Sequence, residues 1–167
     1  DAAARNIGDG DGVGIQQFDR DHPGRRFDPV AAGKFQVDDT GWHAVDVTGL
    51  VQAWIKGTVP MYGVLLDQSE FATPRTMYTS REVAAFKPML MIAYTDSGVT
   101  VCDTLSAAAD AYVTEDLPDS NYGSATALFT GWEAEAGENQ SLIRFLFPME
   151  IPRQAVGDFV WNDENAN

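Results

Sequence analysis

Residues 141–147 read SLIRFLF, and Ile143, Phe145 and Phe147 recur at every second position, with Arg144 between them. Because successive side chains of a strand point to opposite faces, this alternation predicts a strand with one face in a core. Similar runs, separated by Gly, Pro, Asn and Asp, occur at 34–38, 42–47, 62–67, 76–81, 89–94, 99–105, 110–114 and 125–130. The sequence therefore predicts an all-β fold, an antiparallel, jelly-roll-like β-sandwich.

One short helix interrupts this pattern. After Thr48, a potential N-cap, apolar residues at 50, 51, 54 and 55 follow helical spacing, and Gly57 is suited to end the helix in the left-handed conformation. A helix of about two turns is marginal alone, so we expect its apolar stripe to pack on the sandwich.

The length and the charge of the chain narrow the classes of protein to which it can belong. It has 167 residues, enough for one sandwich domain, and a formal net charge of −14. Such a surface repels nucleic acid and anionic lipid, and no apolar run approaches the roughly 18 residues that cross a bilayer. We therefore expect no nucleic-acid partner and no membrane insertion. The single cysteine, Cys102, lies in an apolar run and is expected to be a buried, inert thiol, with an intermolecular bridge as the alternative.

Residues for catalysis are sparse. The two histidines, His22 and His43, have no nucleophile or carboxylate at a spacing that indicates a catalytic pair. Acidic pairs such as Glu133 and Glu135 are expected by chance in so acidic a chain and do not indicate a glycosidase. The sequence therefore favours a protein that is not an enzyme.

Calcium is the cofactor that the sequence allows. Asp9 and Asp11 lie two residues apart in a glycine-rich loop, as oxygen ligands of calcium loops do. The loop lacks the remaining acidic positions of an EF-hand, and 38–39 and 116–119 are equally possible carboxylate pairs. A solvated turn is the alternative for each of these loops.

Aromatic and asparagine residues suggest contacts with sugars. Trp132 and Tyr122 lie at predicted turns and are candidates for stacking on a polysaccharide, although packing in the core is the more common role of an aromatic ring. Asn139, in Asn-Gln-Ser, fits the pattern of a glycosylation acceptor.

Two consecutive segments resemble parts of a known family. GWHAVDVTGLVQAWIKG at 41–57, MYGVLL at 61–66, SRE at 80–82 and KPMLMIAY at 87–94 resemble the second half of a DNRLRE-type domain. DAYVT at 110–114, NYGS at 121–124, SLIRF at 141–145 and IP at 151–152 resemble the first half of such a domain. The resemblance implies a secreted or cell-surface β-sandwich, of a kind found on bacterial and archaeal surface proteins and attached to polysaccharide-active enzymes, some members of which bind carbohydrate.

The order of the halves is the reverse of the family's. We therefore divide the chain into a polar N-terminal segment, 1–32, a half-sandwich at 33–96 and a second half-sandwich at 97–167. Three arrangements are consistent with this order: a permuted single domain, a fragment of a tandem array, or a subunit completed by its neighbours. An unpaired half-sandwich leaves an open edge with which a strand of another chain can pair. If each copy completes the sandwich of the next in a head-to-tail manner, the assembly is a filament. The prediction is a subunit of a filament or surface layer, with copies of itself as partners; a carbohydrate-binding module is the alternative.

Overall fold

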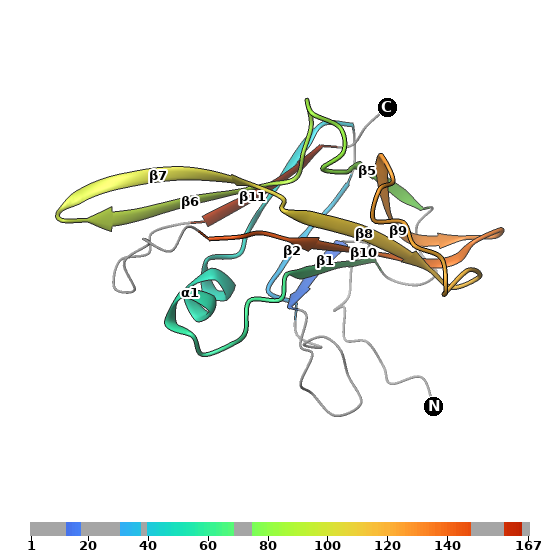
Figure 1. Ribbon diagram of the computed structural model, residues 1–167, viewed down its shortest axis with the longest axis horizontal. Helices are drawn as coiled ribbons and strands as arrows, with labels where there is room; N and C mark the ends of the chain where they lie inside the picture. Colours follow the sequence, from blue (N-terminus) through green and yellow to red (C-terminus); the bar gives the residue numbers. More distant parts are fainter. Residues whose placement is uncertain (1–12, 18–30, 38–39, 69–74, 148–158, 165–167) are drawn as a thin grey trace.

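The computed structural model describes residues 13–17, 31–37, 40–68, 75–147 and 159–164; for Gln17 and 159–164 only the backbone is considered. Two antiparallel sheets and one short helix form a sandwich-like arrangement (Figure 1). The prediction of an all-β antiparallel sandwich with one helix is therefore confirmed.

The larger sheet has seven strands and contains strands from both sequence halves. In spatial order they are β2 (Gly33–Phe35), β1 (Val13–Gln17), β4 (Val64–Gln68), β10 (Gly137–Arg144), β9 (Ala127–Glu133) and β5 (Thr76–Thr79), and β8 (Ala109–Thr114) pairs with β10 outside this path. The alternating burial along β10 follows the predicted pattern, because Ile143 is buried and Arg144 is exposed.

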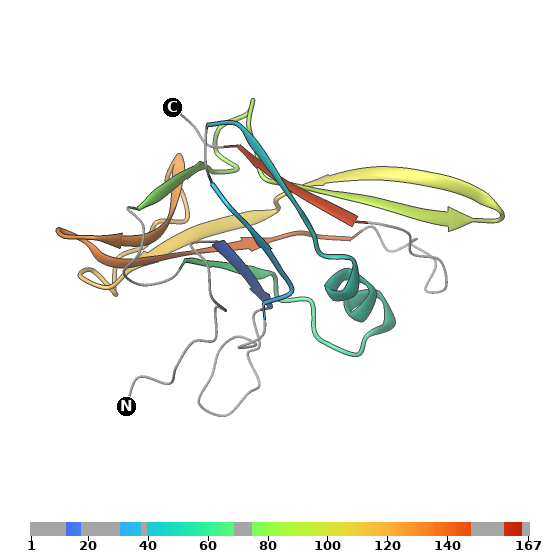
Figure 2. The same cartoon turned by 180° about the vertical axis from the view of Figure 1, so that it is seen from behind.

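The smaller sheet has four strands, in the order β3 (Trp42–Asp46), β11 (Phe159–Glu164), β6 (Met89–Asp96) and β7 (Val99–Ser106). In both views, the turn end of the β6–β7 hairpin extends beyond the rest of the molecule (Figures 1 and 2). Strands β1 and β11 were not predicted, because their short runs lie in polar surroundings.

The two predicted half-sandwiches meet by direct backbone pairing. Ser141, Leu142 and Ile143 of β10 lie opposite Leu66, Leu65 and Val64 of β4 in the antiparallel register. In the other sheet, β11 of the second segment lies between β3 and β6 of the first. Pairing within one chain is the arrangement expected of the permuted single domain.

The core lies between the sheets. Leu66 and Ile143 of the larger sheet and Leu90 of the smaller sheet each have at most 1% of their surface exposed. Phe35 joins the layers through its ring contacts with His43 and Tyr78, whose centroids lie 6.0 and 6.4 Å from its own. Burial of these apolar surfaces is the main force that holds the two sheets together.

Helix α1 (Thr48–Lys56) packs against this core through Leu50, Val51 and Trp54, as predicted. Gly57 ends it with φ +69°, in the left-handed region. The prediction that Thr48 caps the helix is wrong. The N-cap position is occupied by Val47, and the preceding Asp46 accepts a hydrogen bond through Oδ1 from the backbone N–H of Thr48 at 2.8 Å.

Cys102 is exposed, so the prediction of a buried thiol is wrong. Its apolar neighbours Val99 and Val101 belong to the projecting hairpin. Val99 itself is 64% exposed. An apolar run indicates a strand but does not determine whether both of its faces are covered.

Replacement of Gly63 tests the pairing of β4 with β10. Gly63 has φ +117°, and a Cβ atom there would lie 2.5 Å from the carbonyl oxygen of Ile143. Gly63→Ala should therefore lower the free energy of unfolding by about 1–3 kcal/mol, through backbone strain and displacement of β10. Urea denaturation measures the change. Gly49→Ala, which meets no atom within 4 Å, is the control and should be neutral or stabilising; equal effects of the two changes would contradict this register.

Candidate functional site

The β6–β7 hairpin closes through a two-residue turn, Ser97-Gly98, with Asp96 opposite Val99. Both turn residues have positive φ, 49° and 83°, as in a type I′ turn. A turn of this kind is closed by a hydrogen-bonded pair, and hydrogen-bonded pairs alternate with non-bonded pairs along an antiparallel ladder. The odd-numbered residues of β7 therefore bond to β6. At the base of the hairpin, Ala107 N–H follows this pattern and donates to the Pro88 carbonyl at 3.0 Å.

The even-numbered residues of β7 direct their backbone N–H and C=O groups away from β6. Within the part of the chain that the structure describes, β7 pairs with β6 alone. The side chains at these positions, which we call the outer row, are all exposed: Thr100, Cys102, Thr104 and Ser106. The outer row has no charged side chain, in a protein with a net charge of −14. It forms an open, uncharged sheet edge.

Two other edge strands, β3 and β8, have close neighbours. At β3, Gly33 approaches so closely that a Cβ atom on it would lie 2.8 Å from the carbonyl oxygen of Asp46. Next to β8, the ring of Tyr122 stacks on that of Tyr112, with centroids 4.1 Å apart and an interplanar angle of 19°. The edge of β7 is thus the more accessible template for another strand.

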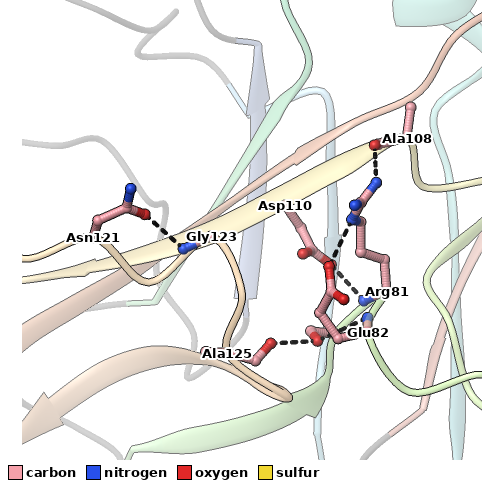
Figure 3. A network of polar contacts seen from close by, with 8 residues as sticks. Arg81, Glu82, Ala108, Asp110, Asn121, Gly123 and Ala125 are labelled. Carbon is pink, nitrogen blue, oxygen red and sulfur yellow. Dashed lines mark hydrogen bonds and ion pairs between the residues drawn. The ribbon is translucent and has the colours of Figure 1, made fainter.

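A polar cluster joins the two sequence halves beside β8 (Figure 3). The backbone N–H of Arg81 donates to Asp110 Oδ2 at 2.6 Å, and its guanidinium donates to the carbonyl oxygen of Ala108. Arg81 Nε also lies 3.0 Å from Glu82 Oε1. Ser80 Oγ completes the cluster by donating to the Ala125 carbonyl at 2.6 Å. These bonds tie the loop after β5 to β8, and we assign them a structural role.

Asp110 is the titratable group of this cluster. Burial raises its pKa above the usual 3.8, while the hydrogen bond from Arg81 N–H and the Arg81 charge act in the opposite direction. The raised pKa means that the interactions with Arg81 offset only part of the free-energy cost of burying the ionised carboxylate. The pKa of Asp46, in contrast, is lowered by its hydrogen bonds with Thr48.

The structure does not bring the two predicted sugar-stacking residues together. Trp132 lies opposite Glu138 in the β9–β10 pair, and Tyr112, on which Tyr122 stacks, lies opposite Ser141. Because 138 and 141 differ in parity along β10, these side chains belong to opposite faces. Trp132 is 43% exposed, whereas Tyr122 is partly covered by its stacking partner. They form no common platform.

Asn139 is fully buried in β10. Its Nδ2 donates to the carbonyl oxygens of Gly131 and Gly137, at 3.3 and 3.1 Å. Nearby, Thr130 is also buried and donates to Gln68 Oε1 at 3.1 Å. A glycosylation acceptor needs an exposed asparagine, so this environment does not fit the predicted modification in the folded protein.

The calcium prediction stays a prediction. Asp9 and Asp11, and also the pair at 38–39, lie outside the described residues. Asp116 and Asp119 are described and exposed. Across the described ranges, no group of three or more His, Cys, Asp or Glu side chains is placed to hold a metal ion.

Comparisons with protein-family models, with curated proteins and with solved structures find no match to this chain. Among the described residues, no helix has the length and apolar character required to span a membrane.

The opposite pKa shifts of Asp110 and Asp46 predict opposite pH effects on stability. The folded-state pKa of Asp110 is raised, so its contribution is present below pH 3.8 and is lost as the pH rises through the folded value. The folded-state pKa of Asp46 is lowered, so its contribution is present above 3.8 and is lost as the pH falls. With urea denaturation from pH 3 to 7, the stability of wild type relative to Asp110→Asn should fall with pH, and relative to Asp46→Asn it should rise. Parallel curves would contradict these assignments.

Proposed function

We propose that this chain is a non-catalytic, extracellular structural protein that assembles with copies of itself, edge to edge, as a subunit of a filament or surface layer. The observation that carries the proposal is the open, uncharged edge of β7. Backbone groups along such an edge are a template for a further strand. Assembly through this edge adds backbone hydrogen bonds. The outer-row side chains that would face the neighbour are uncharged.

The residues of β7 support this interpretation. Natural edge strands are protected by lysine, proline, bulges or inward-pointing charges. The strand reads VTVCDTLS and contains neither lysine nor proline. Its one charged residue, Asp103, points to the covered face of the sheet, where its Oδ2 accepts a hydrogen bond from Tyr94 Oη at 3.1 Å. Asp103 is therefore the one protective charge of this eight-residue strand, and the side chains of the outer row carry none, which suits a protein whose function is association.

The resemblance to DNRLRE-type domains supports an extracellular location, and the pattern of strand pairing suggests where the contact lies. Since β10 pairs with β4 inside the chain, a neighbour is not needed to complete that pair. The proposed contact between subunits therefore uses the edge that remains open. The sparse histidines favour a role without catalysis. The hollow beside β4, β8 and β10 is lined mainly by apolar side chains, together with Asp110 and Arg144, and Asp110 is engaged by Arg81 in the structural cluster.

A carbohydrate-binding module is the second candidate, and the exposure of Trp132 favours it. An indole ring that is 43% exposed offers a flat apolar surface to a sugar ring. In this case the protein would act as a monomer that tethers a larger secreted protein to polysaccharide. A glycan array to which neither wild type nor Trp132→Ala binds would count against this candidate.

A charge placed in the outer row tests the structural role. Thr104→Lys should weaken self-association, because facing copies would bring lysines close to the shared edge, while the exposed side chain leaves the fold intact. Sedimentation equilibrium over a range of protein concentrations measures the average mass. Ser124→Lys, at another exposed position, adds the same charge and should associate as wild type does. A wild type that stays monomeric at every concentration would refute the proposed function.

A further inference from the structure

We infer that β7 pairs antiparallel with β7 of a second copy about a two-fold axis, with Cys102 opposite the partner subunit's Cys102. The two four-stranded sheets would then form one continuous sheet. This inference rests on the proposed function and specifies the partner strand and its register. Because a two-fold contact closes at two copies, it gives a dimer, and extension of that dimer to a filament or layer requires a second contact. The inference is argued from the open edge of β7 and from the position of Asp103. Cys102 serves only as the reporter in the cross-linking test.

The hydrogen-bonding pattern limits the possible registers. Only the even-numbered residues of β7 direct N–H and C=O groups to the open edge. In an antiparallel pair of identical strands, these residues must therefore face one another. The registers with most overlap place the two-fold axis at residue 102, 103 or 104.

The position of Asp103 selects among these registers. An axis at residue 103 places Asp103 directly opposite its copy, and like charges directly opposite destabilise a sheet. An axis at residue 102 places Asp103 opposite Val101 instead and keeps 99–105 paired, a longer overlap than an axis at 104 allows. Hydrogen-bonded pairs have Cα atoms about 5.5 Å apart, so the two Cys102 side chains would lie next to each other on the same outer face.

The charge of the chain explains why a second copy fits this edge. Two molecules that each have a net charge of −14 repel one another, and this repulsion is smallest where the contacting surfaces lack carboxylates. The outer row and the β6 residues opposite it, Met89, Met91, Ala93 and Thr95, are uncharged. The outer row also has threonine at two positions, a residue that packs well across strands. The surface is self-complementary, as a two-fold contact requires.

Cysteine cross-linking tests the register. In a Cys102→Ser background, Thr100→Cys and Thr104→Cys are made separately and treated, alone and mixed, with a thiol cross-linker that spans less than about 10 Å. With the axis at 102, residue 100 faces residue 104 of the partner, whereas identical positions lie four residues, about 13 Å, apart. We expect covalent dimers from the mixture and from wild-type Cys102, and their loss from either variant alone.

The outcomes separate the two proposals. Dimers from Thr104→Cys alone, at the level of the mixture, would place the axis at 103 or 104 and overturn this register. Association seen by sedimentation without any cross-link would overturn β7 pairing but leave self-assembly standing. Monomers at all concentrations would overturn both. Thermal melting of each variant confirms that it is folded before cross-linking.

Discussion

The backbone pairing of β10 with β4 is the contact on which the rest of the structure depends. It joins the two segments that the sequence predicts as half-sandwiches, and it places Ile143 beside Val64 and Leu66 in the core. Because β10 also pairs with β8 and β9, one strand aligns most of the second segment with the first. Gly63 allows the two strands to approach closely, since no side chain fits against the carbonyl of Ile143.

This closure determines which edges are left for other molecules. Strand β3 is approached by Gly33, and the aromatic stack of Tyr112 and Tyr122 lies beside β8. Strand β7 lies at the end of its sheet in a hairpin that extends beyond the rest of the molecule, with an exposed and uncharged outer row. The same acidic charge that keeps copies apart elsewhere makes this edge the favourable place for them to meet.

The sequence predicts the elements of this fold better than their environment. Alternating residues such as Ile143 and Arg144 identify β10, although the predicted strand at 141–147 ends at Arg144, and Gly57 marks the end of α1, because periodicity and left-handed conformations are local properties. The exposure of a side chain depends on strand order, which no local pattern specifies. For this reason the sequence led to the expectation of a buried Cys102 and an accessible Asn139, whereas Cys102 is exposed and Asn139 is buried. Likewise, the opposite faces of Trp132 and Tyr112 follow from the register with β10. The open edge of β7 could not be predicted because it is defined by the neighbours it lacks among the described strands.

Amide hydrogen exchange along β7, compared between dilute and concentrated protein, tests the central claim most directly. In dilute solution, the amides of Val101 and Asp103, which bond to β6, should exchange slowly, and those of Cys102 and Thr104 should exchange fast. The account predicts that concentration protects Cys102 and Thr104 and leaves the odd-numbered residues unchanged. Fast exchange of Cys102 and Thr104 at every concentration would contradict assembly through this edge.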